Sequence, residues 1–431
     1  MQRRAFLGAA AAGAVATAST IAAPASARPA PLGHGRRRVR TGFEALAASG
    51  YRTLRGSRVG MLANPTALTR DLAHEVDVMH ADRRVDLVAV FGPEHGFRGT
   101  AQAGGSQGSY DDPATGLPVY DLYAKTQDEI TQIIGGAGID VLLVDIVEIG
   151  VRYYTYIWSM YQAMVACARL GIGYVVLDRP SPLGASHPRG PVLHPALSTF
   201  VGLKPIAMDY AMTMGELARL DNAEFVPDDA GGRAADLTVV PVQGWRRDDD
   251  ADTTGLPWVL PSPNIPTLDS AFVYAGNGLF EGTNLSEGRG TTKPFETVGA
   301  PYADYHWAAT LNDQDLPGVA FREAYFSPTF SKYVGQTCAG VELHVNDRRA
   351  YDPVRTAVAM IVSARRLYPD DFAWRYDTGD PVDPYDVDKL AGSSLLRDAV
   401  DAGQDTDAVV ATWHDELRAF ERIRSAHLMY R

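Results

Sequence analysis

The sequence has few cysteines and no long apolar segment after its N-terminal region, and both features narrow the possible classes of protein. Among 431 residues there are two cysteines, Cys167 and Cys338. Two cysteines supply neither a disulfide framework nor a thiolate metal site. They could pair in an oxidising compartment, but Cys167 stands in an apolar helical pattern and is expected to be a small core residue. No stretch after residue 27 is apolar enough to span a bilayer.

Positive charge is also scarce. The chain has 40 Lys and Arg against 52 Asp and Glu, which gives a formal net charge of −12. Such an acidic protein is poorly suited to bind nucleic acid or anionic lipid, so neither is expected as a partner. The basic run at residues 36–40 is expected to be a solvated tail.

The common cofactor and metal motifs are absent from the sequence. No G-x-G-x-x-G follows the first strand pattern, and there is no Walker loop, H-E-x-x-H motif or His and Cys cluster. We therefore expect no metal, and a Rossmann-like sheet in this chain need not bind a dinucleotide. Residues 104–108 match the nucleophile-elbow pattern around Ser106, but they lie in a polar loop instead of between a strand and a helix. A serine esterase using Ser106 is thus a disfavoured alternative.

The N-terminus has the pattern of an export signal. Arg3 and Arg4 are followed by an alanine-rich apolar run that ends in an A-x-A pattern at residues 25–27. This predicts a twin-arginine signal peptide over residues 1–27, a flexible lead-in over 28–41, and an exported protein that is extracellular or associated with the cell wall. An uncleaved membrane anchor is the alternative, but Ala and Gly dominate the run where an anchor would have Leu or Ile. We expect no stable membrane insertion after cleavage.

Apolar runs of strand length then alternate with helical patterns, which is the order of an α/β protein with a Rossmann-like parallel sheet. A helix is expected over residues 156–170, with Gly171 at its C-terminal cap. The strand candidates are residues 59–63, 87–91, 141–144 and 174–177.

The second half of the chain has a different pattern. Residues 244–297 are dense in Gly, Pro and Thr, which predicts long ordered loops. A boundary near Gly299 divides the chain into a Rossmann-like catalytic domain over residues 42–298 and a smaller α+β C-terminal domain over 299–431 that closes the cleft. Within the latter we expect a strand at 341–345, a helix at 354–368 and one long helix at 406–429.

Ionisable side chains follow two of the predicted strands. In open α/β sheets, ligands bind beyond the carboxyl ends of the strands. Glu94 and His95 lie there between glycines, and the nearby Arg98 could tune the pKa of the acid. Asp178 and Arg179 follow another strand. The alternatives are a charged turn for the first group and a structural ion pair for the second.

A third group combines an acid with aromatic rings and a guanidinium. Glu148 precedes Arg152, Tyr153 and Tyr154 in the sequence. Aromatic faces stack on apolar sugar faces and arginine binds carboxylates in a forked geometry, so this set suits a sugar that carries an acid. Half-buried core residues at a helix start are the alternative.

The densest polar stretch is residues 281–296. It contains three acids, two bases, one amide and four hydroxyls among three glycines. Loops of this composition are costly to order without a function. A disordered linker would not explain Leu285 and Phe295, so we favour a site loop.

Six ordered blocks together resemble one family, the exo-β-N-acetylmuramidases, which are glycoside hydrolases of peptidoglycan turnover. The resemblance runs from about Gly42 to the C-terminus. The blocks are N-P-T-x-L-T-R-D at 64–71, F-G-P-E-H-G at 91–96, E-I-G-V-R-Y-Y-T-Y at 148–156, D-R-P-x-P-L-G at 178–184, G-L-P-W-V-x-P-S-P-N at 255–264 and E-G-T-N-x-S-E-G-R-G-T-T at 281–292.

This resemblance implies an enzyme that removes terminal β-linked N-acetylmuramic acid, or a related amino sugar, from the non-reducing end of peptidoglycan fragments. Its partners would be muramyl saccharides, and no cofactor is expected. Glu94 is the candidate general acid, with Glu148 or Glu287 as the second carboxylate. The candidate substrate-binding residues are His95, Arg98, Arg152, Tyr153, Tyr154, Asp178, Arg179, Asn264, Glu281, Asn284, Arg289, Thr292 and Lys293.

Two positions depart from the family pattern. Residues 209–213 read D-Y-A-M-T where relatives usually have R-H-G-M-T, and an acid usual near Gly105 is missing. Loss of the Arg and His removes cations that could hold the lactyl carboxylate of N-acetylmuramic acid, and Asp209 would repel it. An exported cell-wall sugar-binding protein without catalysis is therefore the alternative function.

Overall fold

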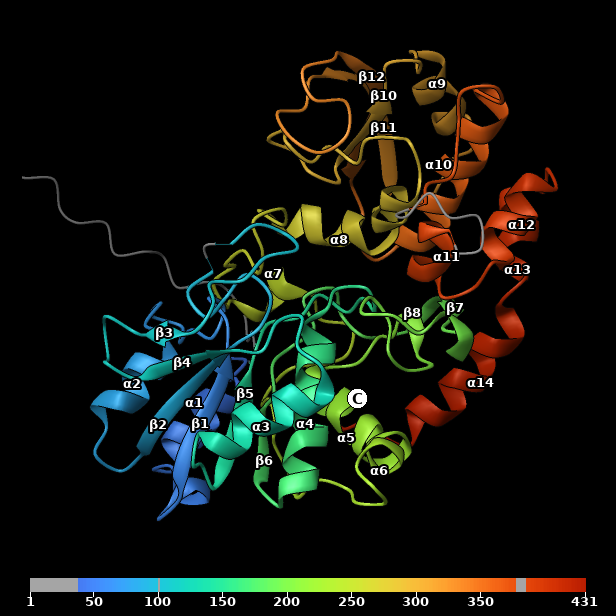
Figure 1. The fold of residues 1–431 in the computed structure, drawn as a ribbon. Coiled ribbons are helices and arrows are strands. Elements are labelled where there is room, and N and C mark those ends of the chain that lie inside the picture. Colours follow the sequence, from blue (N-terminus) through green and yellow to red (C-terminus); the bar gives the residue numbers. More distant parts are fainter. Residues whose placement is uncertain (1–37, 100, 377–384) are drawn as a thin grey trace, which may run out of the picture. The chain divides into compact units, whose positions relative to one another are not determined.

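The computed structural model describes residues 38–99, 101–376 and 385–431. The predicted signal peptide, residues 1–27, and most of the lead-in lie outside these ranges. Within them the chain forms an α/β fold, as the strand and helix patterns predict (Figure 1). No helix in the described part of the chain has the length and apolar character needed to cross a membrane.

The largest element is a seven-stranded sheet in the order β3-β4-β2-β1-β5-β6-β9. Neighbouring strands are parallel except for β3 and β4. The strands are β1 (Arg58–Ala63), β2 (Asp86–Gly92), β3 (Tyr110–Asp111), β4 (Pro118–Asp121), β5 (Val141–Asp145), β6 (Gly173–Leu177) and β9 (Leu237–Val240). The four strands predicted from sequence are confirmed as β1, β2, β5 and β6.

Helices cover both faces of this sheet. Alternate strand residues enter two different cores, because successive side chains of a strand point to opposite faces. Leu142 and Val144 pack with α3 (Gln127–Gly136) and α4 (Tyr156–Leu170), whereas Leu143 packs on the other face. The helix predicted over residues 156–170 is confirmed as α4, with Gly171 in the left-handed conformation at its C-cap. The other helices of this half are α1 (Gly42–Ala48), α2 (Glu75–Ala81), α5 (Met214–Glu224), α6 (Val226–Asp229) and the single turns η1 (Arg52–Leu54) and η2 (Pro195–Leu197).

A smaller antiparallel sheet has the order β10-β12-β11. Its strands are β10 (Thr297–Ala300), β11 (Val319–Phe326) and β12 (Cys338–Val345), and a separate hairpin joins β7 (Arg189–Val192) to β8 (Ala207–Asp209). The accompanying helices are α7 (Ala251–Thr254), α8 (Leu268–Asn277), η3 (Gly278–Gly282), α9 (His306–Asn312), α10 (Pro353–Leu367), α11 (Asp386–Ala391), α12 (Leu395–Asp401), α13 (Thr406–Ala411) and α14 (His414–Ser425). The strand predicted at 341–345 and the helix at 354–368 are confirmed as β12 and α10. The predicted domain boundary falls within β10.

Two predictions about regular elements were wrong. The stretch at 244–297 contains α8, which Thr267 caps by accepting a hydrogen bond from the Ser270 amide. Gly276 lets α8 approach the backbone of Pro353 so closely that an added Cβ would lie 1.9 Å from its carbonyl oxygen. The expected long helix at 406–429 is two helices, because the buried Trp413 interrupts it between α13 and α14.

The end of the chain packs against the large sheet. The amides of Met429 and Tyr430 donate to Glu216 at 2.7 and 3.2 Å. The Tyr430 hydroxyl donates to Asp178, just after β6. Both cysteines are buried and free, so no disulfide joins them in the described structure.

Candidate active site

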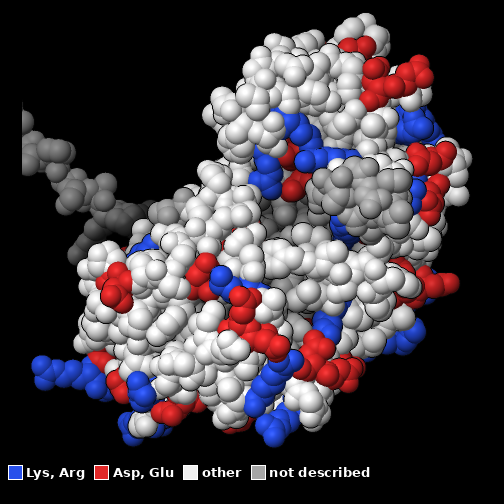
Figure 2. All heavy atoms as spheres, in the orientation of Figure 1, with Lys and Arg blue, Asp and Glu red and all other residues white. Residues whose placement is uncertain are grey.

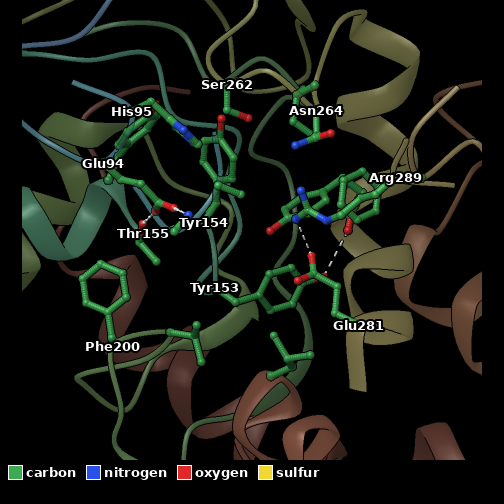
Figure 3. Close-up of a pocket in the computed structure, with 18 of the residues that line it drawn as sticks. Glu94, His95, Tyr153, Tyr154, Thr155, Phe200, Ser262, Asn264, Glu281 and Arg289 are labelled. Carbon is green, nitrogen blue, oxygen red and sulfur yellow. Dashed lines mark hydrogen bonds and ion pairs between the residues drawn. The ribbon is translucent and has the colours of Figure 1, made fainter. Parts of the chain in front are cut away.

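A pocket of about 220 Å³ opens beyond the carboxyl ends of β2 and β5. In the sheet, β2 lies on one side of β1 and β5 lies on the other, so the direction in which successive strands are added reverses at β1. The pocket lies at this reversal, which is the usual ligand site of such sheets. The lining comes from the loops after β2 and β5, from residues 262–265, and from α8 and the segment after it (Figure 3). The lining residues are Glu94, His95, Ala103, Gly104, Tyr123, Tyr153, Tyr154, Thr155, Tyr156, Phe200, Val201, Ser262, Asn264, Ile265, Tyr274, Glu281, Arg289, Phe295 and Leu390.

Glu94 is fixed at the pocket by both carboxylate oxygens. Its Oε1 accepts a hydrogen bond from the Gly104 amide at 2.8 Å, and its Oε2 accepts one from the Thr155 hydroxyl at 2.7 Å. The two donors come from different loops, so the carboxyl group is oriented from two sides (Figure 3). A half-buried carboxyl group fixed in this way is suited to transfer a proton to or from a bound ligand.

His95 lines the pocket in a strained backbone conformation, with φ of 68°. Its Nδ1 lies 2.9 Å from the carbonyl oxygen of Ala101. A carbonyl oxygen only accepts hydrogen bonds, so Nδ1 carries the proton and a neutral His95 has an acceptor lone pair on Nε2. Strained backbone of this kind is concentrated at functional sites.

Aromatic rings form much of the pocket wall. Tyr154 packs edge-on against Tyr156 and Tyr274, and Tyr274 packs in turn against Phe295. Such rings stack on the apolar faces of sugars. The Tyr154 hydroxyl is itself buried, close to the side chain of Ser262, which also lines the pocket.

Glu281 and Arg289 bring charges of both signs to the pocket. Arg289 Nη2 donates to Glu281 Oε1 at 2.9 Å. Although burial opposes the charged form, Glu281 and Glu287 raise the pKa of Arg289. Among the described lining residues, Arg289 is the only Lys or Arg, and Glu94 and Glu281 are the only acids.

Glu148 and Glu287, the two candidates for a second carboxylate, are not among the lining residues. Glu148 is buried, accepts hydrogen bonds from the Tyr210 hydroxyl and the Gly150 and Val151 amides, and has its pKa raised by burial to about 8. Glu287 is buried against Lys332. Although burial alone would raise its pKa, Lys332 and Arg289 lower it. Their contacts indicate structural roles.

We expect Glu148→Gln to remove a pH dependence of stability. Folding raises the pKa of Glu148 from 4.5 to about 8. The stabilisation from this group is complete below the lower value and is lost as the pH rises through the higher one. Glutamine has no such proton, so the variant should gain stability relative to wild type between about pH 5 and pH 8 in urea unfolding. Parallel curves for the two proteins would contradict this, and the exposed Glu323→Gln serves as a control.

Two of the predicted substrate-binding arginines are used elsewhere. Arg98 pairs with Asp77 at 2.9 Å and with Asp112 at 2.7 Å. Arg152 is fully buried and donates to the carbonyl oxygens of Pro191, Ile206 and Leu390. Neither lines the pocket, because both guanidinium groups bind partners within the protein.

Asp178 and Arg179 also lie outside the pocket. Asp178 accepts hydrogen bonds from Thr213 and the Gly215 amide at the start of α5. Arg179 pairs with the buried Asp145 and Glu75. Asp178 and Arg179 do not form an ion pair with each other, because the carboxylate of the first and the guanidinium of the second bind other partners.

Three predicted residues of the 281–296 loop do not line the pocket. Asn284 bonds the Tyr302 hydroxyl at 2.7 Å and the backbone near residue 372. Lys293 pairs with Glu296 at 2.7 Å, and Thr292 is exposed. The loop therefore contributes mainly Glu281, Arg289 and Phe295 to the lining.

Sequence reasoning did not select several lining residues. Thr155 lies within the 148–156 block and Ser262 within the 255–264 block. Their positions next to predicted site residues could have identified them as lining residues. Tyr123, Phe200 and Tyr274 carried no such signal. Ser106 donates to Asp121 at 2.6 Å within a loop, not at a strand-to-helix turn.

Residues 209–213, which differ from the family pattern, also lie outside the pocket lining. Asp209, at the end of β8, pairs with Arg189 at 2.7 Å. Tyr210 donates its hydroxyl hydrogen bond to Glu148. The charge of Asp209 is thus balanced within the protein.

The fold and pocket are those of an α/β protein in which an acid and aromatic rings surround a small cavity. Two family models extend this. The N-terminal model of exo-β-N-acetylmuramidase NamZ matches residues 59–269 and the C-terminal model matches residues 272–430. The chain belongs to the exo-β-N-acetylmuramidase NamZ family and is a glycoside hydrolase, as the sequence resemblance indicated.

Individual relatives are similar over nearly the whole chain. The peptidoglycan β-N-acetylmuramidase NamZ of Bacillus subtilis (strain 168) is 45% identical over 394 residues, covering 91% of this chain and 92% of that protein. Two crystal structures of DUF1343 family proteins from Bacteroides fragilis NCTC 9343 share the fold. One has a TM-score of 0.82 and 33% identity, covering 92% of this chain and all of that chain (100%). The other has a TM-score of 0.71 and 28% identity, covering 91% and 99%.

Proposed function

We propose that the protein removes terminal β-linked N-acetylmuramic acid from the non-reducing end of peptidoglycan fragments, with Glu94 as the general acid. The orientation of the Glu94 carboxyl group by Gly104 and Thr155 at the pocket carries this proposal. A pocket of about 220 Å³ with aromatic walls suits a single pyranose ring, which favours removal of one terminal sugar over cleavage within a long glycan.

The proposed role of Glu94 follows from how glycosides are cleaved. A carboxylic acid protonates the leaving-group oxygen as the bond to the anomeric carbon breaks, and a second carboxylate assists on the other face of the ring. Gly104 and Thr155 both donate to Glu94, so they orient the group without removing its ability to bind a proton on the ligand side.

A chromogenic β-N-acetylmuramide tests the activity directly. Wild type is expected to release the chromophore. On an oligosaccharide of alternating N-acetylmuramic acid and N-acetylglucosamine, mass spectrometry should show free N-acetylmuramic acid as the first product. Binding of the sugar without release would indicate a non-catalytic binding protein, and release of internal disaccharides would contradict terminal action.

We further propose that the protein is exported through a twin-arginine signal. Arg3, Arg4 and the A-x-A pattern at residues 25–27 support this. Expression of the full chain in a bacterium with this pathway should yield an exported form that begins near residue 28. Replacement of both arginines by lysine should retain the precursor in the cytoplasm, and unchanged export would contradict the proposal.

A further inference from the structure

Four charged side chains of alternating sign lead away from the pocket. Glu281 and Arg289 line it and lie 2.9 Å apart. Arg289 Nε lies 3.4 Å from Glu287 Oε1, and Lys332 Nζ lies 2.9 Å from Glu287 Oε2. Lys332 also donates to two backbone carbonyl oxygens, so the far end of this series is anchored to the fold. Figure 2 shows one face of the molecule hollowed near its centre, with basic and acidic side chains gathered along the edge of the hollow.

The backbone around Arg289 is closely packed on both sides. Gly288 and Gly290 both have positive φ. An added Cβ would lie 2.5 Å from the Thr297 carbonyl oxygen at the first position and 2.6 Å from the Phe330 amide nitrogen at the second. The guanidinium lies over the Phe295 ring, 4.9 Å from its centroid. Arg289 is therefore positioned by its surroundings before any ligand binds.

The two acids that contact Arg289 differ in exposure. The side chain of Glu287 is 3% exposed and that of Glu281 is 33% exposed. Glu287 is also bound by Lys332, whereas Glu281 faces the pocket (Figure 3). Glu281 is thus the partner that a ligand can displace. Within the described residues, only Nη2 of the guanidinium makes a hydrogen bond, which leaves other N–H donors for a ligand.

We propose that Arg289 binds the lactyl carboxylate of N-acetylmuramic acid, an inference that rests on the proposed function. Glu281 is the counter-ion of Arg289 in the empty pocket. Glu287 and Lys332 position the Arg289 guanidinium. N-acetylmuramic acid differs from N-acetylglucosamine by a lactyl ether that carries a carboxylate. Arginine binds carboxylates through paired N–H donors, and Arg289 is the only Lys or Arg among the described lining residues.

The test compares two inhibitors that differ only in this charge: free N-acetylmuramic acid and the methyl ester of its lactyl group. Their inhibition constants are measured against turnover of the chromogenic muramide. Wild type should bind the acid roughly 10- to 100-fold more tightly than the ester, because hydrogen bonds to charged groups are strong. The ratio of the two constants does not depend on the active fraction of a preparation, so partial misfolding cannot produce the effect.

Variants locate the effect in the proposed residues. Arg289→Gln should bring the ratio to about one, and Arg289→Lys should give an intermediate ratio, because lysine keeps the charge but not the fork. Glu281→Gln should increase the ratio, since it removes the competing anion. The positioning residue is tested by Lys332→Met, which should lower the ratio and raise KM with little change in kcat. Arg322→Gln, an exposed charge on β11, is the matched control and should leave the ratio unchanged.

The failures of the two proposals are distinguishable. Wild type that does not cleave the muramide contradicts the proposed function. Wild type that cleaves it but binds acid and ester equally, or an Arg289→Gln variant that retains the wild-type ratio, overturns the assignment of Arg289. An unchanged ratio and KM in Lys332→Met would overturn the positioning role while leaving Arg289 as the binding residue.

Discussion

Glu94→Gln is expected to lower kcat for muramide hydrolysis by about 10² to 10⁴-fold, the range that a positioned general acid contributes. Glutamine has nearly the same shape and its carbonyl oxygen can still accept a hydrogen bond from Gly104 or Thr155. It cannot donate a proton to the leaving group. Binding of the free sugar should therefore persist while turnover is lost, and both are measured by inhibition and steady-state kinetics on the same preparation.

Matched variants distinguish the loss of the acidic proton of Glu94 from a general disturbance of the fold. Glu323→Gln makes the same chemical change at an exposed position on β11 and should retain wild-type turnover. Thr155→Val removes one of the donors that orient Glu94 and should give a smaller loss, on the order of 10-fold. If Glu94→Gln retained more than a tenth of wild-type kcat, another group would have to be the acid.

Arg179→Met is expected to lower the free energy of unfolding by about 3–5 kcal/mol. Arg179 lies between the buried carboxylates of Asp145 and Glu75, and all three side chains are almost inaccessible to solvent. Burial and the neighbouring Asp145 raise the pKa of Glu75 well above its usual range even with the arginine present. Without the arginine, two adjacent acids would remain buried without a cation, and the effect is measured by urea unfolding.

The destabilisation should depend on pH in a defined direction. Protonation relieves the repulsion between Glu75 and Asp145, so the loss should be small near pH 4.5 and should grow as the pH rises. Arg322→Met removes an arginine from an exposed pair with Glu342 and should cost below about 1 kcal/mol. A loss for Arg179→Met no greater than that of this control would contradict the role of the buried cluster.

Much of the fold could be predicted from local patterns. Buried parallel strands appear as short apolar runs, and α4 has both an apolar stripe and a glycine at its C-cap, so these elements were readable. Helix α8 was not, because it lies within a stretch dense in Gly, Pro and Thr, and because it packs closely on α10, which is distant in sequence. The break at Trp413 likewise depends on tertiary burial of that side chain.

Only part of the site could be predicted from the sequence. The rule that ligands bind beyond strand ends placed Glu94 and His95 at the pocket, and the glycine-rich loop contributed Glu281 and Arg289. Sequence could not show which charged residues find partners inside the protein. Arg179 pairs with an acid 104 positions away, and such contacts are set by the assembled sheet.

The contact between Tyr430 and Asp178 spans 252 positions of the chain. It connects segments that match the two different family models, and the same distant segment supplies two backbone donors to Glu216. The matched regions are therefore not independent modules: a fragment ending at residue 269 would keep the buried acids Asp178 and Glu216 but lose these donors. Because these bonds join regions so far apart along the chain, we expect folding to be complete only when both regions are present.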